Sequence, residues 1–144
     1  MSTISRLLVP LSGSELDEAV LHEAATIAGP IDAEVVLVSV AHYHTRDSRP
    51  VAVERARRIL DAAEERLREA GLRVQTLVGH GEVADEIVRA AVAQQADLVV
   101  MGARGHGSLR RLIERSVPDD VRRRSRVPVL LVHGTRRMVL VTAA

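Results

Sequence analysis

Short runs rich in valine and leucine alternate along the chain with longer segments whose apolar residues recur every three or four positions. This alternation predicts parallel strands joined by helices. The short runs are apolar throughout, which is typical of strands covered on both faces of a sheet. We therefore expect an α/β domain with helices on both faces and strands at residues 6–11, 34–40, 73–78, 97–102 and 127–133.

The first helix is expected to begin near Ser14, because Ser14 and Asp17 form a capping-box pattern in front of an apolar helical face. Gly29 and Pro30 predict the end of this helix, since glycine favours a left-handed helix end and proline often follows one.

Three further helices are indicated by the same spacing. The clearest has apolar residues at helical intervals over positions 53–70 and should stop at Gly71. The next presents apolar residues over positions 83–91, and the last should open at Ser116 with Pro118 in its first turn. The tail at 134–144 contains an apolar run that predicts an extra strand, paired with this sheet or with a partner's.

The composition fits one soluble domain over residues 1–144. Hydrophobic residues make up 47% of the chain, charged residues 27%, and there is no cysteine, so disulfides and thiolate chemistry are excluded. All 20 basic residues are arginine, which excludes a Schiff-base or P-loop lysine. No apolar stretch reaches the length of a membrane span and the first residues do not form a signal peptide, so we expect a cytoplasmic protein without a membrane partner.

Seven arginines crowd residues 110–126 and make a local basic field. Clustered arginine on a helix can attract a phosphate backbone, but aromatic residues make up only 1% of the chain and provide no stacking platform. A solvated helix face or a clamp for a ligand phosphate explains the cluster equally well, and we expect no nucleic-acid partner.

A glycine-rich segment follows the expected strand at 97–102. Gly102, Gly105 and Gly107 come directly after a buried run, at the sheet edge where ligands bind in open parallel sheets. Glycines let backbone N–H groups approach phosphate oxygens, and the start of the next helix favours an anion. A glycine cluster alone also suits a tight turn, but its position after a strand and the nearby arginines favour an anion site.

These residues resemble the signature of the universal stress protein family, whose nucleotide-binding members carry Gly, two residues, Gly, nine residues, then Gly with Ser or Thr. Here Gly102, Gly105 and Ser116 match that pattern. The resemblance covers nearly the whole chain and includes residues 8–10, 13–14, 78–79, 96–102 and 127–130.

The resemblance implies a three-layer, Rossmann-like sandwich of the adenine nucleotide alpha hydrolase-like type, with a five-stranded parallel sheet in the order 3-2-1-4-5. It also implies a homodimer that binds ATP and works as a sensor or interaction module in stress response. The alternative is a dimer that binds no nucleotide and acts through protein–protein contacts.

In the family mode the nucleotide lies between the ends of the first and fourth strands. Pro10, Leu11 and Ser12 would line its base and ribose, with Val40 near the base and Met101 behind the loop. The phosphates would be surrounded by Gly102, Arg104, Gly105, His106, Gly107, Ser108, Arg115, Ser116 and Val117.

Two positions depart from the family pattern. Relatives usually carry Asp where this chain has Ser12, so a carboxylate for ribose or a metal is missing, and the need for Mg²⁺ is open. The third motif glycine falls at Arg115, whose side chain either binds a phosphate directly or fills the pocket. Both readings remain open.

Catalysis and metal binding have little support in the sequence. No nucleophile elbow or triad pattern surrounds Ser12 or Ser116, so we expect no catalytic residues and at most slow ATP hydrolysis. His42 and His44 alternate in the loop after the second strand without an evident third ligand, so a solvated loop is favoured over a metal site.

The motif supplies a first prediction. Gly105→Val should abolish nucleotide binding while the far-ultraviolet circular dichroism spectrum stays unchanged, because a side chain there would block the backbone approach to phosphate. Unchanged affinity in calorimetry would count against this site. Arg115→Gly separates the two open readings: stronger binding marks the native arginine as a plug, and weaker binding marks it as a clamp.

Overall fold

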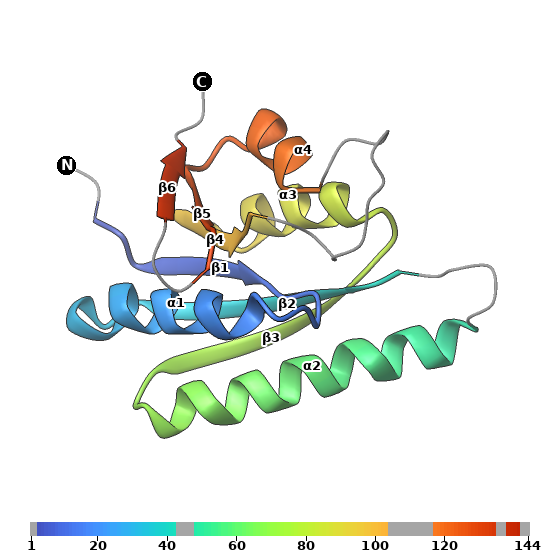
Figure 1. Cartoon of the computed structure of the whole chain (residues 1–144). Coiled ribbons are helices and arrows are strands. Elements are labelled where there is room, and N and C mark those ends of the chain that lie inside the picture. The colour runs from blue at the N-terminus through green and yellow to red at the C-terminus, as the bar shows by residue number, and fades with distance from the viewer. Residues whose placement is uncertain (1–2, 43–47, 104–116, 135–137, 142–144) are drawn as a thin grey trace.

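The computed structural model describes residues 3–42, 48–103, 117–134 and 138–141. Ten elements follow one another in the order β1 (Arg6–Pro10), α1 (Asp17–Ile31), β2 (Glu34–Ala41), α2 (Arg49–Glu69), β3 (Arg73–His80), α3 (Val83–Ala93), β4 (Leu98–Gly102), α4 (Val117–Arg124), β5 (Val129–Val132) and β6 (Met138–Val141). Figure 1 shows the sheet between two layers of helices.

The strands form one sheet in the order β3-β2-β1-β4-β5-β6. The first five are parallel, which confirms the expected order 3-2-1-4-5. Strand β6 adds antiparallel to β5, with Val129 opposite Val141, so the apolar tail pairs with the chain's own sheet. Of the two expected arrangements for the tail, this is the intramolecular one.

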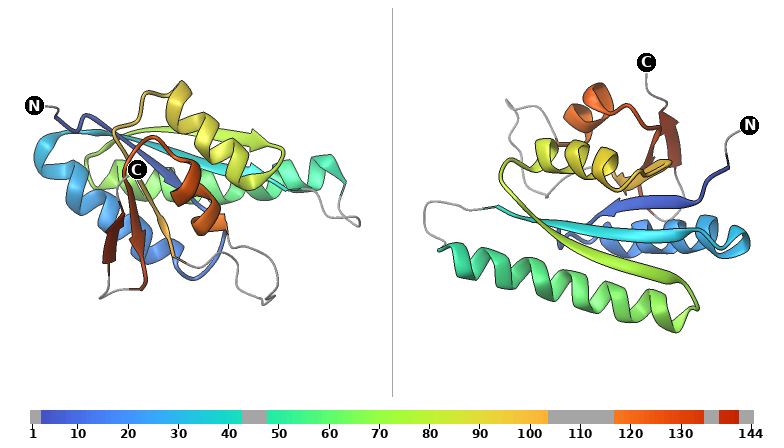
Figure 2. Two further views of the ribbon diagram at one scale, coloured as in Figure 1. Left: turned by 90° about the horizontal axis from the view of Figure 1, so that it is seen from above. Right: turned by 180° about the vertical axis from the view of Figure 1, so that it is seen from behind.

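Side chains alternate between two separate cores, one on each face of the sheet. On one face Leu7, Val9, Val35 and Leu37 pack with buried residues of α1 and α2. On the other face the intervening strand residues pack with α3 and α4, including Ile87. The two views in Figure 2 show the same layers from above and from behind. None of the helices in the described part of the chain is both long and apolar enough to cross a membrane.

Helix α1 differs from its prediction at both ends. It begins at Asp17, not at Ser14, because the two polar side chains fold the preceding turn: the Ser14 hydroxyl accepts from the Leu16 N–H at 3.2 Å, and the Asp17 carboxylate accepts from the Gly13 N–H at 2.8 Å. Its end lies beyond Gly29 and Pro30, where the left-handed Asp32 (φ 54°) stops the helix.

Strand β3 was expected to be apolar throughout, and this is wrong. Its burial is mixed: Val74 and Gly79 are buried, whereas Arg73, Gln75 and Thr76 are exposed. The reason is its position at the edge of the sheet, where one side has no neighbouring strand within the described residues. The predicted stop of α2 is confirmed: the helix ends at Glu69, and Gly71 takes a positive φ of 87°.

A carboxylate at the opposite end of the sheet from the pocket described below fastens β1 to β4. Asp97 Oδ2 accepts from the Ser5 N–H at 2.8 Å and the Arg6 N–H at 3.0 Å, and the Ser5 hydroxyl lies 3.2 Å away. These hydrogen bonds, first that from the Ser5 backbone, hold the pKa of Asp97 below its ordinary value.

Asp97→Asn should therefore lower the free energy of unfolding near pH 7 by about 1–2 kcal/mol. Because the folded pKa is depressed, the carboxylate stabilises the fold above its unfolded pKa of about 4, and this contribution is lost as pH falls through the lower folded value. Urea titrations at pH 7 and pH 3 should show the wild type and the variant converging at the lower pH. Asp61→Asn on the exposed face of α2 is the control, and an equal gap at both pH values would contradict this assignment.

Candidate functional site

A pocket opens where β1 stops short of its neighbours. In the register of the sheet Pro10 is level with Val38, while β2 continues to Ala41. On the other side Leu8 is level with Val99, so β4 reaches past the end of β1 to Gly102. The step leaves a hollow of about 510 Å³ at the carboxyl ends of the strands, which is where open parallel sheets bind ligands.

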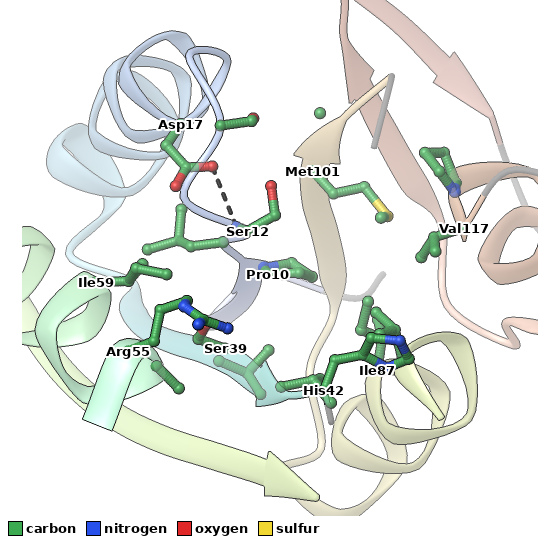
Figure 3. A pocket seen from close by; sticks show the side chains of 18 of the residues that line it. Pro10, Ser12, Asp17, Ser39, His42, Arg55, Ile59, Ile87, Met101 and Val117 are labelled. Atoms are coloured by element: carbon green, nitrogen blue, oxygen red, sulfur yellow. Dashed lines mark hydrogen bonds between the residues drawn. The ribbon is translucent and has the colours of Figure 1, made fainter. Parts of the chain in front are cut away.

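The pocket has two sides because neighbouring strand residues point to opposite faces of the sheet. On the α3 and α4 side it is lined by apolar groups that include Val40, Met101 and Val117. On the α2 side it is lined by Leu11, Ser39 and one stripe of helix α2, namely Ala52, Arg55, Ala56 and Ile59. The spacing of these four helical residues puts them on one face of α2. Figure 3 shows Arg55 and Ile59 on one side of the pocket and Met101 and Val117 on the other.

The turn between β1 and α1 closes the end of the pocket over β1. The Asp17 carboxylate accepts from the Ser12 N–H at 3.3 Å, drawn as a dashed line in Figure 3, and from the Gly13 N–H at 2.8 Å. The carboxylate therefore occupies two main-chain donors that point toward the start of α1. These two N–H groups, which could otherwise bind an external anion, donate to the Asp17 carboxylate of the chain itself.

Gly13 brings this turn against α2. Its φ is +82°, and a Cβ placed there would lie 3.1 Å from Ile59 Cδ1. A side chain at this position would meet both an unfavourable backbone conformation and a side chain of the pocket wall. Gly102 is similarly close to its surroundings, since a Cβ there would lie 3.2 Å from Leu16 Cδ1. Both glycines allow the close packing that shapes the pocket.

Three carboxylates line the pocket, and each has a protein partner. Asp17 binds the turn described above. Glu82 caps α3 by accepting from the Asp85 N–H at 2.8 Å, and Asp120 pairs with Arg123 in α4. Arg123 and Arg124 offset the charges of Asp120 and Glu82, whereas the backbone N–H groups that bind Asp17 favour its charged form.

All the predicted site residues that the structure describes lie in this pocket. They are Pro10, Leu11, Ser12, Val40, Met101, Gly102 and Val117. The remaining predictions fall outside the described residues: Arg104, Gly105, His106, Gly107, Ser108, Arg115 and Ser116.

Apart from Leu11, the residues on the α2 side of the pocket were missed by sequence reasoning. Ser39 is the polar residue in an otherwise apolar run, a signal that was available, whereas Arg55 is one of many arginines on α2 and has no distinguishing pattern. His42 also lines the pocket, but His44 is outside the described residues. Within the described ranges no group of three or more His, Asp or Glu side chains could hold a metal ion.

Comparison with known proteins accounts for this architecture. The model of the universal stress protein family matches residues 3–133. The chain belongs to the universal stress protein family. The universal stress protein Rv1636 of Mycobacterium tuberculosis is 31% identical over 147 residues, which cover 94% of this chain and 100% of the relative. The universal stress protein MJ0531 of Methanocaldococcus jannaschii is 28% identical and covers 92% and 84% of the two chains.

Solved structures of the family share the fold. A crystal structure of a universal stress protein in complex with cAMP superposes with a TM-score of 0.75 at 27% identity, covering 92% of this chain and 99% of that one. The family resemblance seen in the sequence is therefore confirmed, together with its parallel sheet order.

Gly13→Ala tests the contact between the β1–α1 turn and α2. We expect it to lower the free energy of unfolding by about 1–3 kcal/mol in urea titrations, because the positive φ and the approach to Ile59 both disfavour a side chain. Gly71→Ala is the matched control, since Gly71 has a similar φ of +87° but open space around it. If both variants lose equal stability, the contact with Ile59 contributes nothing.

Proposed function

We propose that this universal stress protein binds an adenine nucleotide in the pocket at the ends of β1, β2 and β4. The observation that carries the proposal is the place of the pocket: it lies at the carboxyl edge of the parallel sheet, and the described residues expected from the family mode line it. Apolar side chains of Val40, Met101 and Val117 offer a surface on which a base can pack. The related structure with cAMP supports an adenine nucleotide as the ligand class.

ATP is the particular nucleotide that the sequence motif favours, with Ser12 and Arg115 as the positions that depart from that mode. In this proposal the protein acts in the cytoplasm as a homodimeric sensor or interaction module in stress response. Because residues of α2 and α4 line the pocket, a partner protein would recognise the bound state through these two helices.

One observation favours the second candidate, a dimer that binds no nucleotide. Among the described lining residues there are three carboxylates, Asp17, Glu82 and Asp120, against one guanidinium, that of Arg55. This charge balance is unusual for a site that holds several phosphates. Protein that elutes without nucleotide, and that takes up neither ATP, AMP nor cAMP in calorimetry, would favour this second function.

A variant that fills the pocket tests the proposed site. Val40→Trp should weaken binding of the nucleotide by at least about tenfold, because the larger side chain occupies space in which the base would lie. The matched control is Val92→Trp, since Val92 is 60% exposed on α3 and does not line the pocket.

Isothermal calorimetry with ATP and AMP measures the affinities, and circular dichroism verifies that both variants fold. Equal affinity for Val40→Trp and the wild type would place the nucleotide elsewhere. Equal losses in both tryptophan variants would show a general effect of the substitution and would also count against the pocket.

A further inference from the structure

The α2 side of the pocket contains a buried hydroxyl that the fold does not use. Ser39 is 3% exposed and lines the pocket from the end of β2. Within the described residues its side chain makes no hydrogen bond, whereas that of the other buried serine does: the Ser125 hydroxyl donates to the Val127 carbonyl at 2.7 Å. A buried hydroxyl without a partner costs about 1–3 kcal/mol and is uncommon in native proteins. Its place at a pocket wall indicates that a ligand supplies the partner.

Arg55 provides a positive charge on the same side. Of the described residues that line the pocket, it is the one with a permanent cation, and Figure 3 shows its side chain extending from α2 on the side where Ser39 lies. A guanidinium has five N–H donors in a planar fork, so it can bind an anion in addition to a partner within the protein. Its most favourable ligands are carboxylate and phosphate.

This polar pair lies apart from the motif expected to hold the nucleotide's main phosphates. That motif begins at Gly102 at the end of β4, whereas Ser39 and Arg55 belong to β2 and α2, beyond the end of β1. Leu11 and Ser12, which the family mode assigns to the base and ribose, lie between the two regions. The base and the ribose of a bound nucleotide are therefore nearer to the pair than its 5′ phosphates, and of these two parts the ribose is the one whose hydroxyls can carry a phosphate.

We propose that Ser39 and Arg55 form a subsite for a phosphate carried on the 2′ or 3′ oxygen of the ribose. In this arrangement the Ser39 hydroxyl donates to one phosphate oxygen and the Arg55 guanidinium binds the others. The ligand class is then an adenosine nucleotide with a second phosphate on its sugar, and the inference rests on the proposed nucleotide function. The carboxylate of Asp17 is held by the turn amides and disfavours an anion next to Ser12, which directs the sugar phosphate toward Arg55.

Calorimetry on the full chain with adenosine, AMP, adenosine 2′,5′-bisphosphate and adenosine 3′,5′-bisphosphate tests the subsite. We expect one of the two bisphosphates to bind about tenfold more tightly than AMP. Arg55→Gln should remove this preference and leave AMP affinity within about twofold of the wild type. The matched control is Arg58→Gln: Arg58 lies on the same helix, is 78% exposed, pairs with Glu54 and does not line the pocket.

Ser39→Ala distinguishes a ligand-binding hydroxyl from a structural one. Removing a buried hydroxyl without a protein partner should leave the melting temperature unchanged or raise it, while the preference for the bisphosphate falls several-fold. A lower melting temperature together with unchanged bisphosphate affinity would identify Ser39 as structural and overturn its role here.

The remaining outcomes separate the two proposals. If AMP binds and neither bisphosphate binds more tightly, the subsite is refuted and the proposed function stands. If Arg55→Gln weakens AMP as much as the bisphosphate, Arg55 binds the 5′ phosphate and the assignment to the sugar is wrong. If none of the four compounds binds, both proposals fail.

Discussion

The length of β1 relative to its neighbours determines where the pocket of this molecule opens. Because Pro10 ends the strand level with Val38 while β2 and β4 continue, the middle of the sheet has a step at its carboxyl edge. Residues at the ends of the longer strands β2 and β4 then line the pocket, because β1 does not continue between them. The same register is held at the other end by Asp97, which binds the backbone N–H groups of Ser5 and Arg6. The Asp97 hydrogen bonds at one end of the sheet and the pocket at the other end therefore depend on the same register between β1 and β4.

Much of the fold could be predicted from the sequence because parallel strands that are buried on both faces appear in it as short apolar runs. The five apolar runs lie within two residues of the observed strands, and the spacing of alanine and leucine in α2 identifies its buried face. The errors fall where tertiary context decides. Ser14 and Asp17 shape a turn because its amides need acceptors. Strand β3 is partly exposed because it is the outer strand, and its polar residues Arg73, Gln75 and Thr76 already depart from an apolar run.

The candidate site divides in the same way. Residues at the ends of strands, such as Pro10 and Met101, could be anticipated because the family resemblance assigns them to the site and strand ends converge at one edge of a parallel sheet. The contribution of α2 could not, because the helix reaches the pocket by packing on β2 and β3 and by the close approach of Gly13 to Ile59, contacts between segments far apart in the chain. Arg55 acquires its position from this packing of α2 and not from any motif around it.

Strand β6 has a consequence for assembly. By pairing antiparallel with β5 it covers the edge that β5 would otherwise present, so within the described residues the outer strands of the sheet are β3 and β6. Two copies that joined their sheets into one continuous surface would have to do so through one of these strands. Strand β6 has only four residues, so an interface formed through it would contain few backbone hydrogen bonds. Most of the contact between the subunits would then come from the surfaces around this strand.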